Sequence, residues 1–462
     1  MYKIFYKPDD AFAADFIPFW HGGKFRLFYL KDWRNREKHG EGVAWFQLAT
    51  EDFLNFEELG ESIPRGTDAE QDLYVFTGSV IRADEKFHIL YTGHNPHFGN
   101  KNKPIQAVMH AVSDDLLNWR KIPEDTFYSN TEKYEAHDFR DPFVFYDEAN
   151  QKYCMLLVAR KKDSGYHSGF TALYTSGDLK QWADGGDFWS PGLYHTHECP
   201  DLFRIGGWWY MIYSEYSDKS MTRYVMSRNQ YGPWEIPADD LFDGRAYYAA
   251  KSYSDGEKRC LFGWIPTKTD NNDYGGWMWG GNLAVHEIFQ REDGTLGCKL
   301  PNTIRDQWRL KSALDGKITV ANSYGKASEL LFKDTAAAFR LDAKFSFTGG
   351  ARQFGISFCQ DFKENSGYKY AFLPPQNSVR FDYEKGCVNT KDLTRPLDLK
   401  AGQVVDTTLI VDNDICVMYI NGDIALSSRM YNIGGRDVSF FAVGGEAAAE
   451  DVKLYGFSEM KT

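Results

Sequence analysis

One sequence pattern occurs three times in the chain, as ATEDFLNFEE at 49–58, VSDDLLNWRK at 112–121 and TSGDLKQWAD at 175–184. The aspartate of each copy lies 63 residues from that of the next, and an aromatic residue always follows four positions later. A looser fourth copy is MSRNQYGPWE at 226–235. A fixed long period is typical of proteins that repeat one supersecondary unit. The pattern therefore predicts a repeat architecture for the first part of the chain.

A pair of short apolar segments joined by a polar turn precedes each copy. The second segments of these pairs are FRLFYL from 25, FHILYT from 87, YCMLLV from 153, WYMIYS from 209 and RCLFGW from 259. Runs of this length and composition indicate buried strands, and helical periodicity is almost absent. Five units, each too small to bury a core alone, fit the blades of a β-propeller. A β-sandwich with chance repetition is the alternative.

The composition of the chain changes after Pro301. The stretch from 302 to 330 is polar and lacks a strong period, whereas alternating strands resume at about 337. Their spacing and turn signals are typical of an antiparallel sandwich. We therefore predict an all-β protein, with a five-bladed β-propeller catalytic domain at 1–305, a linker at 306–330 and a C-terminal β-sandwich at 331–462.

The charge and composition exclude several classes of function. The net charge is −12, which argues against nucleic acid or an anionic membrane surface as a partner. No apolar run is long enough to cross a bilayer, and the first residues lack a signal-peptide pattern. The seven cysteines have no CxxC spacing, and His195 and His197 have no third ligand at metal spacing. We expect a cytoplasmic protein without metal or cofactor; its oligomeric state is not predicted.

Three carboxylates head predicted innermost strands of different blades. They are Asp15 in AADFIPFW, Asp141 in RDPF and Glu198 in ECPDLF. Because the first strand of each blade lies nearest the propeller axis, these side chains should converge on one central funnel. A pair of carboxyl groups is what glycoside hydrolysis needs, one as acid and one as nucleophile or base. The simpler interpretation is that each is an ordinary turn residue at a strand end.

Several segments resemble glycoside hydrolase family 32, the β-fructosidases that include invertases, inulinases and levanases. RDPFVF and ECPDLF are similar to two signatures of that family, and FTGS at 76–79 is similar to its FSGS segment. The stretch WGGNLAVHEIFQREDGTLGCKLP at 279–301 resembles its last propeller strands. The resemblance implies a propeller followed by a sandwich. At the nucleophile motif, where the family usually has Asn-Asp-Pro-Asn-Gly, this chain has Ala14-Asp15-Phe16-Ile17-Pro18.

The resemblance also implies roles for the three carboxylates. Asp15 would attack the anomeric carbon of a terminal fructosyl unit, and Glu198 would protonate the leaving oxygen. Asp141, beside Arg140, would hold ring hydroxyls. The implied function is a retaining glycoside hydrolase that releases β-fructofuranosyl units from sucrose-like or short fructo-oligosaccharide substrates. We name as candidate substrate-binding residues Arg140, Trp20, Trp33, Phe76, Ser79, Tyr247 and Trp279.

Two other functions stay open at this point. An inverting arabinofuranosidase or xylosidase like those of family 43 would also use three carboxylates on five blades. A catalytically inactive glycan-binding protein would explain the altered residues around Asp15. A phosphorylase would need a basic pocket for phosphate, and Lys251 and Arg245 are the candidates for it. The partner in each of the first two cases is a small carbohydrate.

Overall fold

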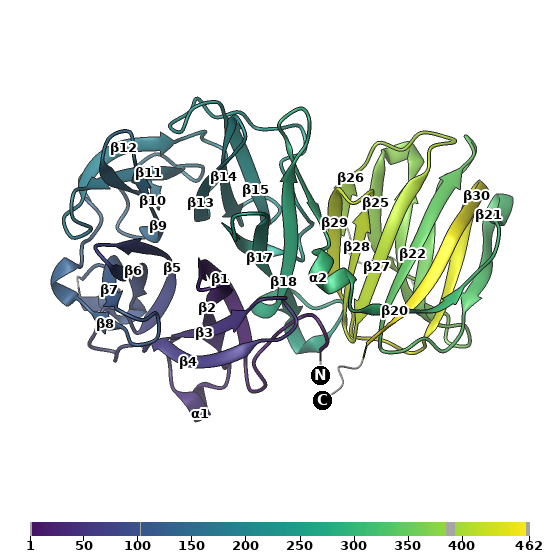
Figure 1. Cartoon of the computed structure of the whole chain (residues 1–462), viewed down its shortest axis with the longest axis horizontal. Coiled ribbons are helices and arrows are strands. Elements are labelled where there is room, and N and C mark those ends of the chain that lie inside the picture. The colour runs from purple at the N-terminus through teal and green to yellow at the C-terminus, as the bar shows by residue number, and fades with distance from the viewer. Residues whose placement is uncertain (1, 102, 385–392, 459–462) are drawn as a thin grey trace.

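The computed structural model describes residues 2–101, 103–384 and 393–458 and consists almost entirely of strands. It has two parts that lie side by side in Figure 1, a ring of small sheets and a layered β-sandwich. The ring contains the N-terminal strands and the sandwich the C-terminal ones. The predicted fold class, a five-bladed propeller followed by a sandwich, is confirmed. Cys387 lies outside the described residues.

The strands of the ring follow the chain from the axis outward in each blade. Blade one has β1 (Phe12–His21), β2 (Lys24–Asp32), β3 (Trp45–Thr50) and β4 (Glu57–Ile63). Blade two has β5 (Tyr74–Ala83), β6 (Lys86–His94), β7 (Gln106–Ser113) and β8 (Arg120–Lys121). Blade three has β9 (Arg140–Asp147), β10 (Lys152–Arg160), β11 (Gly169–Ser176) and β12 (Ala183–Trp189). Blade four has β13 (Glu198–Ile205), β14 (Trp208–Glu215) and β15 (Met221–Ser227). Blade five has β16 (Tyr248–Ser254), β17 (Arg259–Lys268), β18 (Trp277–Gln290) and β19 (Leu296–Lys299).

The repeated aspartates occupy equivalent corners of the first three blades. Oδ1 of Asp52 accepts hydrogen bonds from the backbone N–H groups two and three residues later, at 3.0 and 2.8 Å. Asp115 and Asp178 make the same pair of bonds. The residue after each aspartate has a φ between 63° and 65°. The sequence repeat is therefore a turn, in which an Asx-type side chain replaces missing backbone partners.

Blade four differs from the expected four-stranded form. Its outer position is taken by a segment that touches β15 only through isolated bridges, Met226 to Glu235 and Arg223 to Leu241. Pro233 and Pro237 stand in or beside this segment and lack the N–H group that a continuous ladder needs. The fourth copy of the repeat was recognisable in sequence, but proline prevents it from forming a regular strand.

The ring closes where the last blade meets the first. Ala13 of β1 pairs with Gly281 of β18, so that blades one and five form one continuous sheet. A Cβ atom at Gly281 would lie 1.8 Å from the Ile265 carbonyl oxygen, so only glycine fits at this crossing. The N-terminal segment adds to the closure, because Leu283 N donates to Tyr6 O at 2.8 Å.

The sandwich consists of strands whose bounds are β20 (Trp308–Ala313), β21 (Ile318–Phe332), β22 (Ala338–Phe347), β23 (Gln353–Asp361), β24 (Ser366–Leu373), β25 (Ser378–Tyr383), β26 (Thr394–Pro396), β27 (Val405–Asp412), β28 (Ile415–Ile420), β29 (Ile424–Arg429) and β30 (Asp437–Phe457). The first part of β30 pairs with β23 and its second part with β22, so this long strand belongs to both layers. Short helical turns complete the chain, namely α1 (Arg36–His39), α2 (Asn302–Arg305), η1 (Pro96–Lys101), η2 (Pro123–Asp125), η3 (Thr269–Asn271) and η4 (Pro374–Gln376).

The linker predicted at 306–330 needs correction. Strands β20 and β21 lie within it, and both pair with β30 in the sheet of the sandwich. The polar composition that suggested a connector is explained by exposure, because most residues of strand β21 are exposed. An edge strand of this kind carries little of the apolar alternation that sequence reasoning needs. The domain boundary itself stays a prediction.

The seam between the two parts contains buried polar contacts beside apolar packing. Arg429 of β29, 1% exposed, donates to the backbone oxygens of Ile265 and Pro266 and to Asn282 Oδ1. Asp243, in the chain leading to blade five, accepts from Ser427 N and Oγ at 2.6 and 2.5 Å. The sandwich is thus fixed to blade five, which also forms one wall of the central cavity described below.

Candidate active site

The three predicted carboxylates line one cavity at the centre of the ring. It has a volume of about 510 Å³ and receives residues from all five blades. Asp15, Asp141 and Glu198 share it with the predicted residues Arg140, Phe76 and Trp279. The further lining residues are Asp32, Arg36, Val43, Tyr74, Gln106, Cys199, Tyr216, Tyr248 and Ala249. A cavity of this volume is large enough for small sugars.

A β-bulge in every innermost strand aims these side chains at the axis. In four of these strands, two consecutive residues face a single residue of the neighbouring strand; the first of each pair is Asp15 in β1, Asp141 in β9, Cys199 in β13 and Ala249 in β16. In β5 the register leaves out Thr77 alone. Four of these residues have left-handed φ values between 46° and 59°: Asp15, Asp141, Cys199 and Ala249. Bulges re-aim side chains, and strained backbone of this kind concentrates at functional sites.

The bulges divide the cavity residues into layers, and the three carboxylates do not occupy equivalent positions of their strands. Asp15 and Asp141 lie within their bulges, whereas Glu198 is the last paired residue before its own. Glu198 is therefore equivalent to Arg140 and Tyr248, which precede the bulges of β9 and β16. In the cavity, Glu198 accepts hydrogen bonds from both Arg140 and Tyr248.

Asp15 accepts hydrogen bonds from neutral donors. Thr77 Oγ1 donates to its Oδ2 at 2.7 Å and Trp264 Nε1 to its Oδ1 at 3.0 Å. Burial raises the pKa of Asp15 to about 7; the charges of Asp141 and Glu198 add to this, while the two hydrogen bonds oppose it. Both oxygens are occupied as acceptors, an arrangement that suits the ionised form and holds the carboxylate in one orientation.

Glu198 lies between a cation and a phenol. Arg140 Nη2 donates to its Oε1 at 2.9 Å, and the Tyr248 hydroxyl donates to its Oε2 at 2.5 Å. Burial raises the pKa of Glu198, and the charge of Asp141 acts in the same direction against the opposing effect of Arg140. A carboxyl group whose proton affinity is raised by its surroundings can serve as a general acid near neutral pH.

Asp141 is 4% exposed and is held by the Thr92 hydroxyl of blade two and the Cys199 backbone of blade four. Its N–H donates to Thr92 Oγ1 at 2.7 Å, and its Oδ2 accepts from Cys199 N at 3.0 Å. Arg140 Nε lies 4.0 Å from the same oxygen. One carboxylate oxygen is therefore fixed by blade four, and the residue as a whole is part of the cavity wall.

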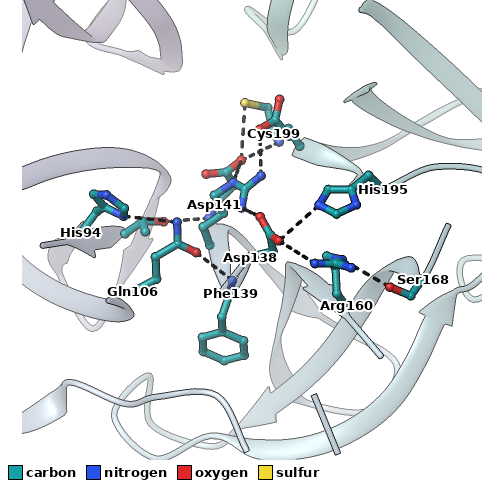
Figure 2. Close-up of polar contacts among 12 residues, drawn as sticks. His94, Gln106, Asp138, Phe139, Asp141, Arg160, Ser168, His195 and Cys199 are labelled. Carbon is teal, nitrogen blue, oxygen red and sulfur yellow. Dashed lines mark hydrogen bonds and ion pairs between the residues drawn. The ribbon is translucent and has the colours of Figure 1, made fainter. Parts of the chain in front are cut away.

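The segment that carries Arg140 and Asp141 is anchored by a polar network (Figure 2). Figure 2 shows Asp138 between Arg160 and His195. Asp138 Oδ2 lies 3.3 Å from Arg160 Nη1 and 3.6 Å from His195 Nε2, and Asp138 also binds Arg140. Phe139 N donates to Gln106 Oε1 at 2.9 Å. Burial alone would raise the pKa of Asp138, but the charge of Arg140 holds it below its usual range. The network fixes the direction in which Arg140 reaches Glu198.

Four predicted substrate-binding residues do not line the cavity. Trp20 packs on Phe25 in the propeller core, and Trp33 stacks on His39 near helix α1. Ser79 Oγ accepts from Val144 N at 2.9 Å, and the Tyr247 hydroxyl donates to Leu261 O at 3.0 Å. For Tyr247 the reason is register: successive residues of a strand point in opposite directions, and its neighbour Tyr248 faces the cavity.

Sequence reasoning missed two direct partners of the carboxylates, Tyr248 and Trp264. Trp264 ends the segment RCLFGW, one of the repeated second strands, and pairs with Tyr248 in the ladder. Allowing for the bulge in β16 would have placed Tyr248 at the cavity, and Trp264 would then have followed as its partner in the ladder. His197 is buried against Trp189 and near Thr171, away from the cavity lining. Within the described part of the chain, no group of three or more His, Cys, Asp or Glu side chains could hold a metal ion.

A central cavity with paired carboxyl groups in a propeller defines the class of protein as a glycoside hydrolase. Residues 7–296 match the family model described as Glycosyl hydrolases family 32 N-terminal domain. The chain therefore belongs to glycoside hydrolase family 32. This assignment sets aside the family 43 alternative.

Known proteins of similar sequence and structure agree with this assignment. The sucrose-6-phosphate hydrolase of Vibrio alginolyticus is 25% identical over 404 residues, which cover 82% of this chain and 75% of that protein. The structure of sucrose-6-phosphate hydrolase from Lactobacillus gasseri superposes with a TM-score of 0.78 at 17% identity, covering 99% of this chain and 93% of that one. The exo-inulinase of Aspergillus awamori superposes with a TM-score of 0.76 at 17% identity, covering 99% and 98%.

Proposed function

We propose that this enzyme is a retaining β-fructofuranosidase that releases terminal fructosyl units from short fructosides. The observation that carries the proposal is the meeting of Asp15, Asp141 and Glu198 in one cavity, each with a different set of polar partners. The relatives named sucrose-6-phosphate hydrolase and levanase act, by those names, on fructosides. The altered residues around Asp15 leave its carboxylate in the cavity.

In the first step, the Asp15 carboxylate attacks the anomeric carbon of the terminal fructosyl unit. A covalent fructosyl–aspartyl ester forms, the bond from that carbon to the leaving oxygen breaks, and Glu198 gives its proton to this oxygen. In the second step, Glu198 takes a proton from a water molecule, which attacks the same carbon. The ester breaks, fructose leaves with its anomeric configuration retained, and both carboxyl groups return to their starting states.

The surroundings of the two residues support this division of roles. Asp15 is oriented by Thr77 and Trp264, and neither partner has to lose a proton or a charge for the carboxylate to attack. Glu198 is held by Arg140 and Tyr248 and can exchange a proton while its position is kept. Asp141, fixed by Cys199 N, is placed to accept hydrogen bonds from ring hydroxyls that strengthen in the transition state.

The cavity also favours action at chain ends. It is bounded by all five blades and holds about 510 Å³, so a terminal sugar can enter it more readily than the middle of a polymer. We include cytoplasmic action on neutral fructosides in the proposal. The six described cysteines are buried free thiols, as is usual in a reducing compartment. Among the described residues, no helix combines the length and the apolar character required to cross a bilayer.

The test is turnover of a panel of sucrose, short fructo-oligosaccharides, inulin and levan, followed by NMR of the fresh product. The proposal predicts fructose as the first product, with retained anomeric configuration. Inversion would contradict the mechanism, and an early ladder of internal fragments would contradict exo-action. Binding without hydrolysis would favour the glycan-binding alternative, which the divergent segment around Asp15 motivates.

A further inference from the structure

Lys251 is a buried cation that the mechanism above does not use. It lies on β16, the innermost strand of blade five, and is 2% exposed. Its Nζ donates to the Pro200 carbonyl at 2.7 Å and lies 5.3 Å from the centre of the Phe143 ring. Within the described residues this is its one hydrogen bond, although an ammonium group has three donors. Burying such a group is costly unless the charge has a purpose.

The bulges place Lys251 in the layer next to the carboxylates. It is the first paired residue after the bulge of β16, as Phe143 is in β9 and Asp201 is in β13. Ile17 has the same place in β1, two residues after Asp15. Lys251 therefore occupies the layer next to that of Asp15 and Asp141, and its ammonium group contacts Pro200 of blade four and Phe143 of blade three.

Charges around the cavity are unevenly matched. The Arg140 guanidinium forms ion pairs with Asp138 and Glu198, so its positive charge is already paired with these two carboxylates. Asp15 has two neutral partners and no cation within 4.0 Å among the described residues. Its carboxylate must nevertheless be ionised to attack. Lys251 is a nearby buried cation that is not held in any described ion pair.

The groups that face Lys251 come from three strands. They are Asp15 on β1, Asp141 on β9, and Cys199 and Asp201 on β13, together with the ring of Phe143. Asp201 is already bound by Ser252 N and Oγ at 2.7 and 2.5 Å, and the charge of Arg259 also acts on it. Burial raises the pKa of the Cys199 thiol well above its usual value, so the thiol stays neutral. Asp141 has the Arg140 guanidinium 4.0 Å away, so Asp15 is the negative group of this set without a described ion pair of its own.

We propose that Lys251 is a positioning residue of the reaction. From the layer next to the cavity, its positive charge keeps the Asp15 carboxylate ionised, and its bond to Pro200 fixes the bulge that follows Glu198. The inference rests on the proposed role of Asp15 as nucleophile. A residue that only filled space in this layer would need no charge, and methionine would fill it at lower cost.

Three substitutions separate charge from packing. Lys251→Gln keeps a donor that can reach Pro200 but removes the charge, Lys251→Met removes both, and Lys251→Arg keeps the charge. Lys268→Gln is the matched control. Lys268 is also a buried lysine of blade five whose Nζ donates to a backbone oxygen, that of Asp273, and it does not line the cavity.

Two readouts follow the charge of Asp15. The first is the acidic limb of kcat/KM against pH on sucrose. The second needs no turnover: it is the pH titration of the Trp264 indole N–H signal in NMR, because this group donates to Asp15. Trp264→Phe identifies the signal. Removing a nearby positive charge raises the pKa of a carboxyl group, so both midpoints should rise in Lys251→Gln and Lys251→Met. A midpoint that rises by about one pH unit makes kcat/KM below the limb about tenfold lower.

Lys251→Arg and Lys268→Gln should keep both midpoints near those of the unchanged enzyme. The proposal is overturned if either uncharged variant is folded, by circular dichroism and melting, and titrates like the unchanged enzyme. If Lys251→Gln does not fold, Lys251→Met carries the test; if neither uncharged variant folds, Lys251 is a structural residue and the proposal fails. An inactive unchanged enzyme whose Trp264 signal still shifts with Lys251→Gln would contradict the proposed function while leaving this inference intact.

Discussion

Asp15 in the cavity and Asp243 at the seam are two buried aspartates of the same ring, and their surroundings shift their pKa values in opposite directions. Asp243 accepts hydrogen bonds from Gly244 N, Ser427 N, Ser427 Oγ and His286 Nε2. Burial would raise its pKa, but these bonds and the facing His286 hold the pKa of Asp243 below its usual value. Asp15 has two donors, and burial raises its pKa to about 7.

The difference shows how one fold uses carboxylates for stability and for chemistry. At the seam, both carboxylate oxygens accept two hydrogen bonds each, so the group joins two parts of the molecule. In the cavity, the carboxylate is left under-compensated and can exchange its hydrogen-bonding environment for a covalent bond. The comparison predicts opposite effects when each aspartate is replaced by the isosteric asparagine.

The largest expected effect is on activity. Asp15→Asn removes the atom that forms the covalent bond, so kcat should fall by at least about 10⁴-fold. The loss should be similar for sucrose and for a fructoside with an activated leaving group, because neither substrate replaces the nucleophile. Steady-state rates on both substrates measure this. Near-normal turnover would mean that the nucleophile lies elsewhere in the cavity.

Glu198→Gln should have the next largest effect. It removes the proton donor and the base, and general acid–base catalysis supplies about 10²–10⁴-fold. The loss should be smaller for a leaving group that needs no protonation, and added azide should accelerate the second step. Equal losses on both substrates, without any azide effect, would contradict the assignment of Glu198 as acid and base.

The same two aspartates should differ in stability. A carboxyl group whose folded-state pKa is raised costs stability that grows as the pH rises from its ordinary value to about 7. Asp15→Asn should therefore raise the melting temperature, more at pH 8 than at pH 5. The pKa of Asp243 is lowered, so its stabilisation is present above its ordinary value and is lost as the pH falls.

Asp243→Asn is accordingly expected to lower the melting temperature at pH 8 and less so at low pH. Its kcat below the melting range should stay near that of the unchanged enzyme, because Asp243 does not line the cavity. Removing one partner of a buried, hydrogen-bonded charge pair typically costs about 3–5 kcal/mol, and asparagine keeps some of the bonds. Melting curves of Asp15→Asn and Asp243→Asn at pH 8 and at pH 5 measure both effects. If Asp15→Asn lowered the melting temperature at pH 8, the claim that the ionised Asp15 carboxylate costs stability would be wrong.

The smallest effects concern the hydrogen bonds to the carboxyl groups. Trp264→Phe removes a donor to Asp15 and should raise its pKa above about 7, which moves the acidic limb of kcat/KM upward. Tyr248→Phe removes a donor to Glu198 and should raise the pKa of that acid, which moves the alkaline limb upward. Each variant should move one limb. If each variant moved the other limb instead, the roles of nucleophile and general acid would have to be assigned the other way round.

The blades could be predicted from the sequence because the same turn side chains recur in successive blades. Asp52, Asp115 and Asp178 each bond to their own turn, so the pattern is local and visible in one dimension. The sandwich was predicted with less accuracy at its start, since β21 is an exposed strand and its partner β30 lies more than one hundred residues later.

The site was predicted in part for a different physical reason. The three carboxylates were found because each heads an apolar strand. Tyr248 was missed in favour of Tyr247 because a single bulge residue reverses which side chains face the axis. Bulges depend on backbone strain and on contacts between blades, such as Cys199 N with Asp141, which no local pattern encodes.

The most direct test of the account is to identify the residue that carries the covalent fructosyl group. Glu198→Gln should form the ester from a fructosyl donor with an activated leaving group but hydrolyse it slowly, so the intermediate accumulates. Digestion and mass spectrometry should then find one fructosyl unit on the peptide that contains Asp15, and none in the Asp15→Asn, Glu198→Gln double variant. A fructosyl group on another residue, or turnover with inversion and no labelled peptide, would contradict the account.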